Sequence, residues 1–125
     1  MTVHAINHVQ LGFPRGGEDA VRRFYGTLVG LTELRYSAGG ELHFVAGSQR
    51  IDLIPTEDED WRPPPRTAVL LAFEVHNLPR LRQQMLAQQL PIEERQPLPG
   101  YLRFRVRDPA GNWLEFIEPD PTTSL

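Results

Sequence analysis

The chain has 125 residues, of which 40% are hydrophobic and 23% are charged, and its formal net charge is −3. This composition is ordinary for a globular protein, and no apolar run approaches the roughly 20 residues that cross a bilayer, so a membrane role is excluded. The absence of cysteine and lysine excludes disulfides, thiolate metal sites and Schiff-base chemistry, and the acidic balance provides no broad basic field for nucleic acid, which leaves a small molecule as the expected partner.

The N-terminus lacks the basic and apolar stretches of a secretory signal, so we expect a cytoplasmic protein. The first predicted module covers residues 4–55. Its first strand alternates in polarity and places Val9, Leu11 and Phe13 on the apolar face. Apolar residues at helical spacing predict a helix over residues 18–30, which should cover this face. Three short strands separated by glycine turns follow, at residues 32–36, 41–46 and 49–54. The predicted order is βαβββ.

An acidic, proline-rich stretch over residues 56–66 is predicted to be an extended linker. Residues 67–119 then repeat the βαβββ order. Their first strand is predicted over 67–75 and their helix over 78–90, and the apolar side of this helix carries Leu78, Leu81, Met85 and Leu86. The last three strands are predicted near residues 92–95, 102–107 and 113–118, and the tail, 120–125, has no pattern. Because neither half is long enough for a sound core alone, residues 1–125 are expected to fold as a single domain.

The two halves also match at particular positions. Each half closes on a carboxylate inside an apolar strand, Asp52 in the first and Glu115 in the second. Placing His8 on Leu70 brings Asp52 almost onto Glu115. A duplicated unit with side chains of metal-ligand type at equivalent positions predicts a cavity shared between the two halves.

Three sequence features make this arrangement specific. They are the paired βαβββ order with His8 in the first strand, the segment 22–31 with the sequence R-R-F-Y-G-T-L-V-G-L, and the segment 108–115 with the sequence D-P-A-G-N-W-L-E. Together they resemble the vicinal oxygen chelate superfamily, which contains glyoxalase I, extradiol dioxygenases, fosfomycin-resistance enzymes and bleomycin-binding proteins. The resemblance covers nearly the whole chain. It implies an α+β fold in which two βαβββ modules form a curved, barrel-like mixed sheet with helices outside, and, since small members commonly dimerise, a homodimer.

The resemblance also implies metal ligands on the first and last strands of each module. These positions fall on His8, Asp52, Leu70 and Glu115, and Leu70 cannot coordinate a metal. The remaining imidazole and two carboxylates suit Zn, Ni, Mn, Fe or Mg. Such a metal would polarise a substrate carbonyl, with Glu115 as the expected catalytic residue. The alternative interpretation is that the three side chains are ordinary polar residues on the exposed face of a sheet.

Further side chains are predicted to line the cavity. Arg103 and Arg105 share one strand face, where they would neutralise Glu115 or bind a substrate carboxylate or phosphonate. Solvated surface pairs are the other interpretation of these arginines. Trp113 and Gln10 share the faces of the candidate ligands and are candidate substrate-binding walls. For Trp113, packing at an interface competes with this role.

Two other residues have open roles. His43 lies on a strand next to that of Asp52, where it is a candidate substitute ligand or proton carrier, although an ordinary half-exposed histidine is expected. Trp61 in the linker either caps the cavity or anchors the linker.

Three functions are compatible with these features. The first is a metal-dependent enzyme of the glyoxalase and dioxygenase type that uses His8 and Glu115 as ligands, assisted by Asp52 or His43. The second is a metal-free protein that binds a small molecule, as bleomycin-binding relatives do, and Leu70 and the acidic balance favour it. The third is a catalytically silent domain retained for interaction.

Overall fold

The structure is a computed structural model that describes residues 2–35, 39–96 and 98–120. The chain divides into two compact units, Met1–Pro63 (unit 1) and Pro64–Leu125 (unit 2). The boundary falls inside the proline-rich stretch 56–66. No helix in the described part of the chain is long and apolar enough to span a membrane.

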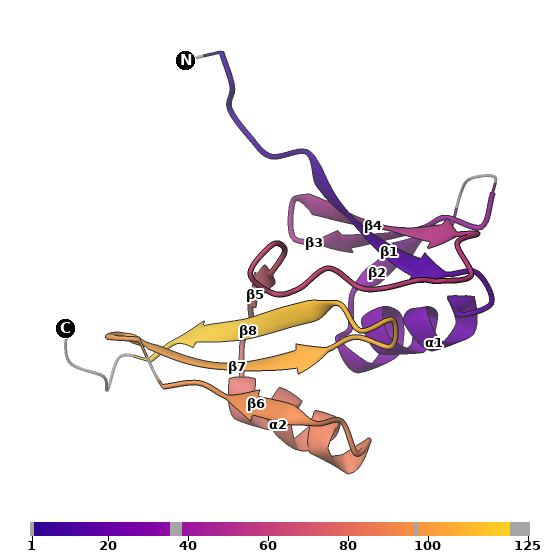
Figure 1. The fold of residues 1–125 in the computed structure, drawn as a ribbon. Coiled ribbons are helices and arrows are strands. Elements are labelled where there is room, and N and C mark those ends of the chain that lie inside the picture. Colours follow the sequence, from indigo (N-terminus) through magenta and orange to yellow (C-terminus); the bar gives the residue numbers. More distant parts are fainter. Residues whose placement is uncertain (1, 36–38, 97, 121–125) are drawn as a thin grey trace. The chain divides into compact units, whose positions relative to one another are not determined.

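Unit 1 contains four strands and one helical segment (Figure 1). Its elements are β1 (His8–Pro14), α1 (Glu18–Arg22), η1 (Arg23–Leu28), β2 (Thr32–Leu34), β3 (Leu42–Ala46) and β4 (Gln49–Thr56). The strand order in the sheet is β1-β4-β3-β2. The pair β1–β4 is parallel, whereas β4–β3 and β3–β2 are antiparallel. The predicted order βαβββ is therefore confirmed for this half.

The core of unit 1 lies between the sheet and its helix. Leu11 and Phe13 are buried, as the alternation in β1 predicts, and the ring of Tyr25 from the helix lies 5.7 Å from that of Phe44 in β3. The helix differs from prediction in one respect, because its second half, η1, is a π-helix. Its wider turn is visible in the hydrogen bond from the N–H of Val29 to the carbonyl of Phe24, five residues earlier.

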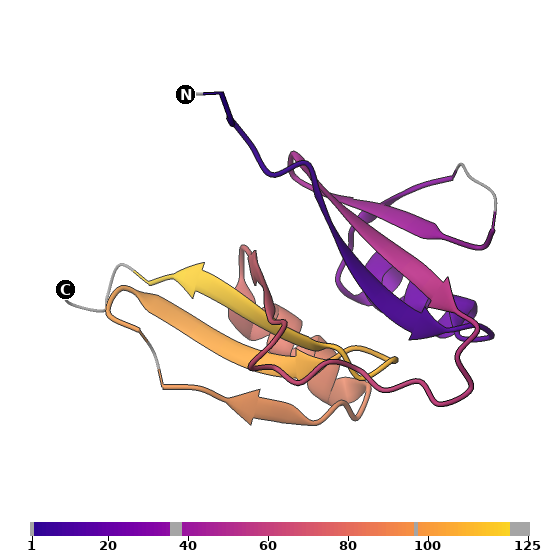
Figure 2. The same ribbon diagram turned by 45° about the horizontal axis from the view of Figure 1, so that its top comes forward.

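Unit 2 repeats this architecture (Figure 2). Its elements are β5 (Leu71–Glu74), α2 (Leu78–Ala87), β6 (Ile92–Glu94), β7 (Tyr101–Arg107) and β8 (Trp113–Pro119). The strand order is β5-β8-β7-β6, with β5–β8 parallel and the other pairs antiparallel. Each strand thus has a counterpart four strands later in the chain, which confirms the α+β class and the duplication. Among the described residues the strands pair into two separate sheets, so strand pairing does not close a single barrel.

Two predicted boundaries in unit 2 are wrong. The strand predicted over residues 67–75 is shorter, because the N–H groups of Ala68 and Val69 both bond to the carbonyl of Pro65, and this turn delays the strand until Leu71. Leu70 therefore precedes β5. The helix predicted over 78–90 ends at Ala87. Leu86 is 46% exposed, since it lies at the margin of the buried stripe of α2 rather than within it.

The end of β8 fixes the start of α2. The carboxylate of Glu118 accepts hydrogen bonds from the backbone N–H groups of Asn77 and Leu78, at 2.5 and 2.8 Å. These donors have no partner inside the helix, and a negative charge at a helix N-terminus is favourable. The contact holds α2 on the sheet of unit 2.

Candidate functional site

The strand register places Asp52 and Glu115 at equivalent positions of the two sheets. In unit 1 the partner of Asp52 on the parallel strand is Gln10, and in unit 2 the partner of Glu115 is Ala72. His8 precedes Gln10 by two residues, and Leu70 precedes Ala72 by the same number. Residues two apart on a strand share a face, so His8 and Asp52 lie on the polar side of the unit 1 sheet, whereas Leu70 precedes β5 and has no such strand position.

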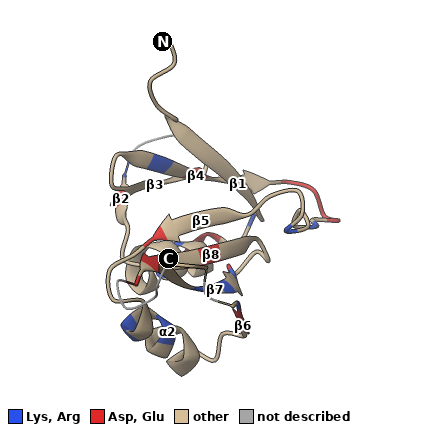
Figure 3. Ribbon diagram, turned by 90° about the vertical axis from the view of Figure 1, so that its left-hand side faces the viewer, with Lys and Arg blue, Asp and Glu red and all other residues tan. Residues whose placement is uncertain are grey.

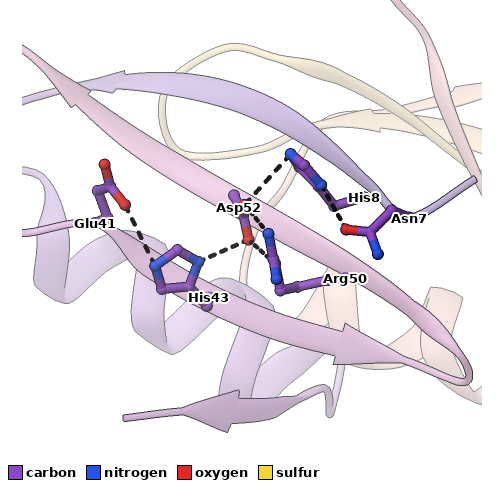
Figure 4. Close-up of polar contacts among 6 residues, drawn as sticks. All are labelled: Asn7, His8, Glu41, His43, Arg50 and Asp52. Atoms are coloured by element: carbon purple, nitrogen blue, oxygen red, sulfur yellow. Dashed lines mark hydrogen bonds and ion pairs between the residues drawn. The ribbon is translucent and has the colours of Figure 1, made fainter. Parts of the chain in front are cut away.

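In unit 1 the carboxylate of Asp52 is buried among cationic and imidazole groups (Figure 4). Nδ1 of His43 lies 2.7 Å from its Oδ1, and Arg50 donates from Nε and Nη2 to its two oxygens at 2.8 and 3.1 Å. Nε2 of His8 lies 3.9 Å from Oδ2. An ionised carboxylate only accepts hydrogen bonds, so Nδ1 of His43 carries the proton in this pair. Its Nε2 faces the Glu41 carboxylate at 3.4 Å.

The environment keeps Asp52 ionised. Burial acts to raise the pKa of this carboxyl, but hydrogen bonds from Arg50 and His43 outweigh burial and hold the pKa below its usual range. His43 itself is only 5% exposed, so the expectation of a half-exposed histidine is wrong. The reason is its place on β3, an inner strand of the sheet, directly opposite Asp52.

In unit 2 the carboxylate of Glu115 is buried and paired with arginines. Nε of Arg105 donates to Oε1 at 3.0 Å, and Nη1 of Arg103 lies 3.6 Å from the same oxygen. Arg103 also donates from Nε to the carbonyl of Gln96. Both guanidinium side chains are largely buried, which distinguishes them from solvated surface pairs. The arrangement matches the neutralising role considered for these two residues.

The other two candidate substrate-binding residues lie on separate sheets. Gln10 is exposed on the polar face of β1, beside Asp52 in the register. Trp113 begins β8 and contacts two arginines, with the guanidinium carbons of Arg107 and Arg66 at 4.6 and 5.3 Å from the ring centroid. Gln10 therefore belongs to the sheet of unit 1, and Trp113 belongs to the sheet of unit 2.

Trp61 packs on unit 1. A Cβ atom built on Gly12 would lie 2.7 Å from Cη2 of Trp61, so the indole ring rests directly on the backbone of β1. Gly12 lies on the polar face of the strand, between the buried Leu11 and Phe13. The tryptophan thus covers part of that polar face and attaches the linker to it. A glycine that interrupts a strand often marks such a close approach, and this signal was present in the sequence.

Two arginines contact the candidate site residues but are not predicted to do so from the sequence. Arg50 donates two hydrogen bonds to Asp52. The two residues are two apart on the same strand and therefore share a face, and this spacing is the sequence signal for the contact. Arg66 lies at the end of the predicted linker, but it bonds to Glu93 and contacts Trp113. No sequence pattern indicated that it folds back on unit 2.

The donor set does not fit a divalent metal as it is arranged within the units. Among the described residues, no three histidine, aspartate or glutamate side chains come together in a way that could hold a metal ion. Arg50 occupies both oxygens of Asp52, and two guanidinium groups lie within 3.6 Å of the Glu115 carboxylate. Positive charge at such distances opposes the approach of a second cation.

The segment with the sequence D-P-A-G-N has a structural role. Oδ1 of Asp108 accepts hydrogen bonds from the N–H groups of Ala110 and Asn112, and the Asn112 side chain donates to Oδ2. Gly111 adopts a positive φ of 90° in the same turn. This turn separates the two strands predicted near residues 102–107 and 113–118. The segment joins β7 to β8 and thereby sets the register between Arg105 and Glu115.

The chain belongs to the Glyoxalase/Bleomycin resistance protein/Dioxygenase superfamily, whose family model matches residues 5–116. A protein from Bacillus anthracis that is described as a glyoxalase family member shares 29% identity, with a TM-score of 0.84 and coverage of 96% of this chain and 98% of the other. None of the curated proteins matches the chain.

Two more distant structures share the fold. Lactoylglutathione lyase from Agrobacterium tumefaciens has a TM-score of 0.71 at 22% identity, covering 94% of this chain and 96% of the other. TnmS3, an antibiotic-binding protein from Streptomyces sp. CB03234, has a TM-score of 0.73 at 16% identity, covering 96% and 99%. The same fold therefore occurs in a lyase and in a binding protein.

Proposed function

We propose that this protein binds a small molecule without a metal, as a binding member of its superfamily. One observation carries the proposal. Both equivalent carboxylates, Asp52 and Glu115, are buried and paired with arginines of their own sheets. A buried carboxylate needs a cationic partner, and here the chain supplies that partner itself.

Pairing of these carboxylates with arginine in place of a metal has a chemical consequence. An arginine is always charged, so it neutralises the carboxylate at every physiological pH. A metal that approached Asp52 would have to displace the two hydrogen bonds from Arg50. The fold is also compatible with binding alone, because TnmS3, named as an antibiotic-binding protein, is built in the same way.

A metal-dependent enzyme of the glyoxalase and dioxygenase type is the second candidate. It is favoured by the register, which puts Asp52 and Glu115 at equivalent positions, and by Nε2 of His8, 3.9 Å from Asp52. The set His8, Asp52 and Glu115 with Zn, Ni, Mn or Fe stays a prediction, as does a catalytic role for Glu115. Leu70 leaves this set one ligand short of four.

Metal analysis decides between the two candidates. Protein purified without chelator is analysed for metals and then titrated with Mn, Fe, Ni and Zn in a calorimeter, alongside His8→Ala and Glu115→Ala. His4→Ala and Glu74→Ala are matched controls, since both residues are exposed. The proposal predicts no stoichiometric metal in any variant. One metal per chain in the wild type and in both controls, lost in His8→Ala and Glu115→Ala, overturns it.

We also propose that the protein is a homodimer. Each sheet ends in strands that pair on only one side within their own sheet, β1 and β2 in unit 1 and β5 and β6 in unit 2. The extended segment before β1 carries Val3 and Ile6, which are 70% and 67% exposed. Sedimentation equilibrium measures the mass, and a monomer at all concentrations contradicts the proposal. The cytoplasmic location stays a prediction.

A further inference from the structure

Unit 2 contains a cavity of about 480 Å³ beside Trp113. Its lining residues are Pro91, Ile92, Glu93, Arg107 and Trp113. The volume falls within the range of roughly 300–1,000 Å³ that is typical of small-molecule sites. The register of β7 and β8 pairs Arg107 with Trp113, so both side chains lie on the polar face that also carries Glu115. The cavity is formed by unit 2 alone.

Strands β6, β7 and β8 carry both arginines and glutamates, which the ribbon in Figure 3 shows in blue and red, and on the face around the cavity the arginines predominate. Five arginines gather there, three of them on β7 and two held by ion pairs to Glu93, and they are Arg103, Arg105, Arg107, Arg66 and Arg95. The carboxylates of Glu93 and Glu115 contribute negative charge to the same face. A third carboxylate on the face, that of Glu74, lies on β5, at the opposite edge of the sheet from β6. Even with Glu74 counted, the face is cationic.

One of these guanidinium groups retains capacity for an anion. Arg107 contacts the ring of Trp113, and no carboxylate among the described residues pairs with it. Arg95 is not among the residues that line the cavity, and its Nε is buried. The hydrogen bond from Arg66 lowers the pKa of Glu93, with Arg95 and Arg105 nearby, so this carboxylate stays ionised beside its arginine partners.

We propose that this cavity binds an aromatic carboxylate. The flat ring lies against Trp113 and Ile92, and the carboxylate accepts hydrogen bonds from Arg107. Aromatic side chains favour flat ligands, and the planar guanidinium group matches a carboxylate in a two-point contact. This inference rests on the proposed function, for which it names the class of ligand.

The test uses three probes on the whole chain after metal has been removed with EDTA. Calorimetry measures the affinity for 2-naphthoate, for its uncharged counterpart 2-naphthamide, and for cyclohexanecarboxylate, which has the charge but no aromatic ring. Because a hydrogen bond to a charged group is worth more than a neutral one, we expect 2-naphthoate to bind at least about tenfold more tightly than 2-naphthamide. It should also bind more tightly than cyclohexanecarboxylate, which cannot make the aromatic contact with Trp113. Equal affinity for naphthoate and naphthamide overturns the proposal.

Variants locate the binding in this cavity. Arg107→Gln should weaken 2-naphthoate about tenfold and remove the preference over 2-naphthamide. Arg80→Gln removes the same charge from the exposed side of α2 and should leave the affinity unchanged. Arg107 is exposed and contributes nothing to the core, so its variant should fold, and Trp113→Leu provides a second test of the aromatic contact. If Arg107→Gln and Arg80→Gln behave alike, the proposal is wrong.

The same titration repeated with Mn, Fe, Ni or Zn separates this inference from the proposed function. If 2-naphthoate binding requires metal but still depends on Arg107, the proposal of metal-free binding is wrong, and the proposal that the ligand binds in this cavity is supported. If binding needs no metal and is insensitive to substitution of Arg107, metal-free binding is supported, and the proposal that the ligand binds in this cavity is wrong.

Discussion

Asp52 and Glu115 occupy the same register position in two sheets of identical strand order, and they differ in the residue that lies opposite on the neighbouring antiparallel strand. His43 faces Asp52, whereas Arg105 faces Glu115. The two modules therefore share the carboxylate but differ in the residue opposite it on the antiparallel strand. The change is chemically important, because an imidazole can lose its charge near neutral pH and a guanidinium cannot.

Asp52→Asn should lower the free energy of unfolding by about 1–3 kcal/mol, because it leaves the Arg50 guanidinium and the Nδ1–H of His43 without an anionic acceptor. About a third of the Arg50 side chain is exposed, so water partly replaces the lost contact, and the cost stays below that of a fully buried pair. Urea unfolding measures the difference.

Glu57→Gln is the matched control for this substitution. Glu57 pairs with Arg15 at 2.6 Å, but both side chains are largely solvent-exposed. Exposed pairs contribute little, so the control should change stability by less than about 1 kcal/mol. An effect of Glu57→Gln as large as that of Asp52→Asn would show that burial of the Asp52 cluster does not matter.

The stabilisation by Asp52 should depend on pH. The pKa of this carboxyl lies below its usual range, because hydrogen bonds from Arg50 and His43 outweigh the effect of burial. A lowered pKa in the folded state means that the unfolded chain binds the proton more readily. The contribution is therefore complete above the ordinary carboxyl pKa of about 4 and is lost as the pH falls through the lower folded value. The stability difference between wild type and Asp52→Asn should shrink from pH 6 to pH 3, and a constant difference contradicts this assignment.

Gly12→Ala should displace Trp61. The new Cβ would lie 2.7 and 2.8 Å from Cη2 and Cζ3 of the indole, which form the far end of a side chain that can move, so the strand itself should stay in place. In a Trp113→Phe background Trp61 is the only tryptophan, and its fluorescence should shift to the red. Gly26→Ala is the control, since its Cβ would meet Phe44 at an ordinary 3.6 Å. A red shift in both variants, or in neither, would speak against the Trp61 contact.

The sequence predicts those features that depend on local pattern. The polarity of residues 8–13 is sufficient to predict β1 and its buried Leu11 and Phe13, and the repeat is sufficient to place Asp52 and Glu115 at equivalent register positions of their own sheets. The features that were missed depend on contacts between distant segments. The turn at Pro65 that shortens β5, and Arg66 folding back to Glu93, are decided by packing within unit 2 and leave no periodic signal.

The turn between β7 and β8 should be the most sensitive part of unit 2 outside its apolar core. Asp108 is buried, and its carboxylate accepts from the N–H groups of Ala110 and Asn112 and from the Asn112 side chain. Asp108→Ala leaves these donors unsatisfied and should cost about 1–3 kcal/mol in urea unfolding. Pro109→Ala changes an exposed residue of the same turn and should cost less than about 1 kcal/mol. Because the turn sets the register of Arg107 against Trp113, Asp108→Ala should also weaken 2-naphthoate binding, whereas Pro109→Ala should not. Equal stability of the two variants would mean that the turn is held by the backbone hydrogen bond between Asp108 and Asn112 and not by the carboxylate.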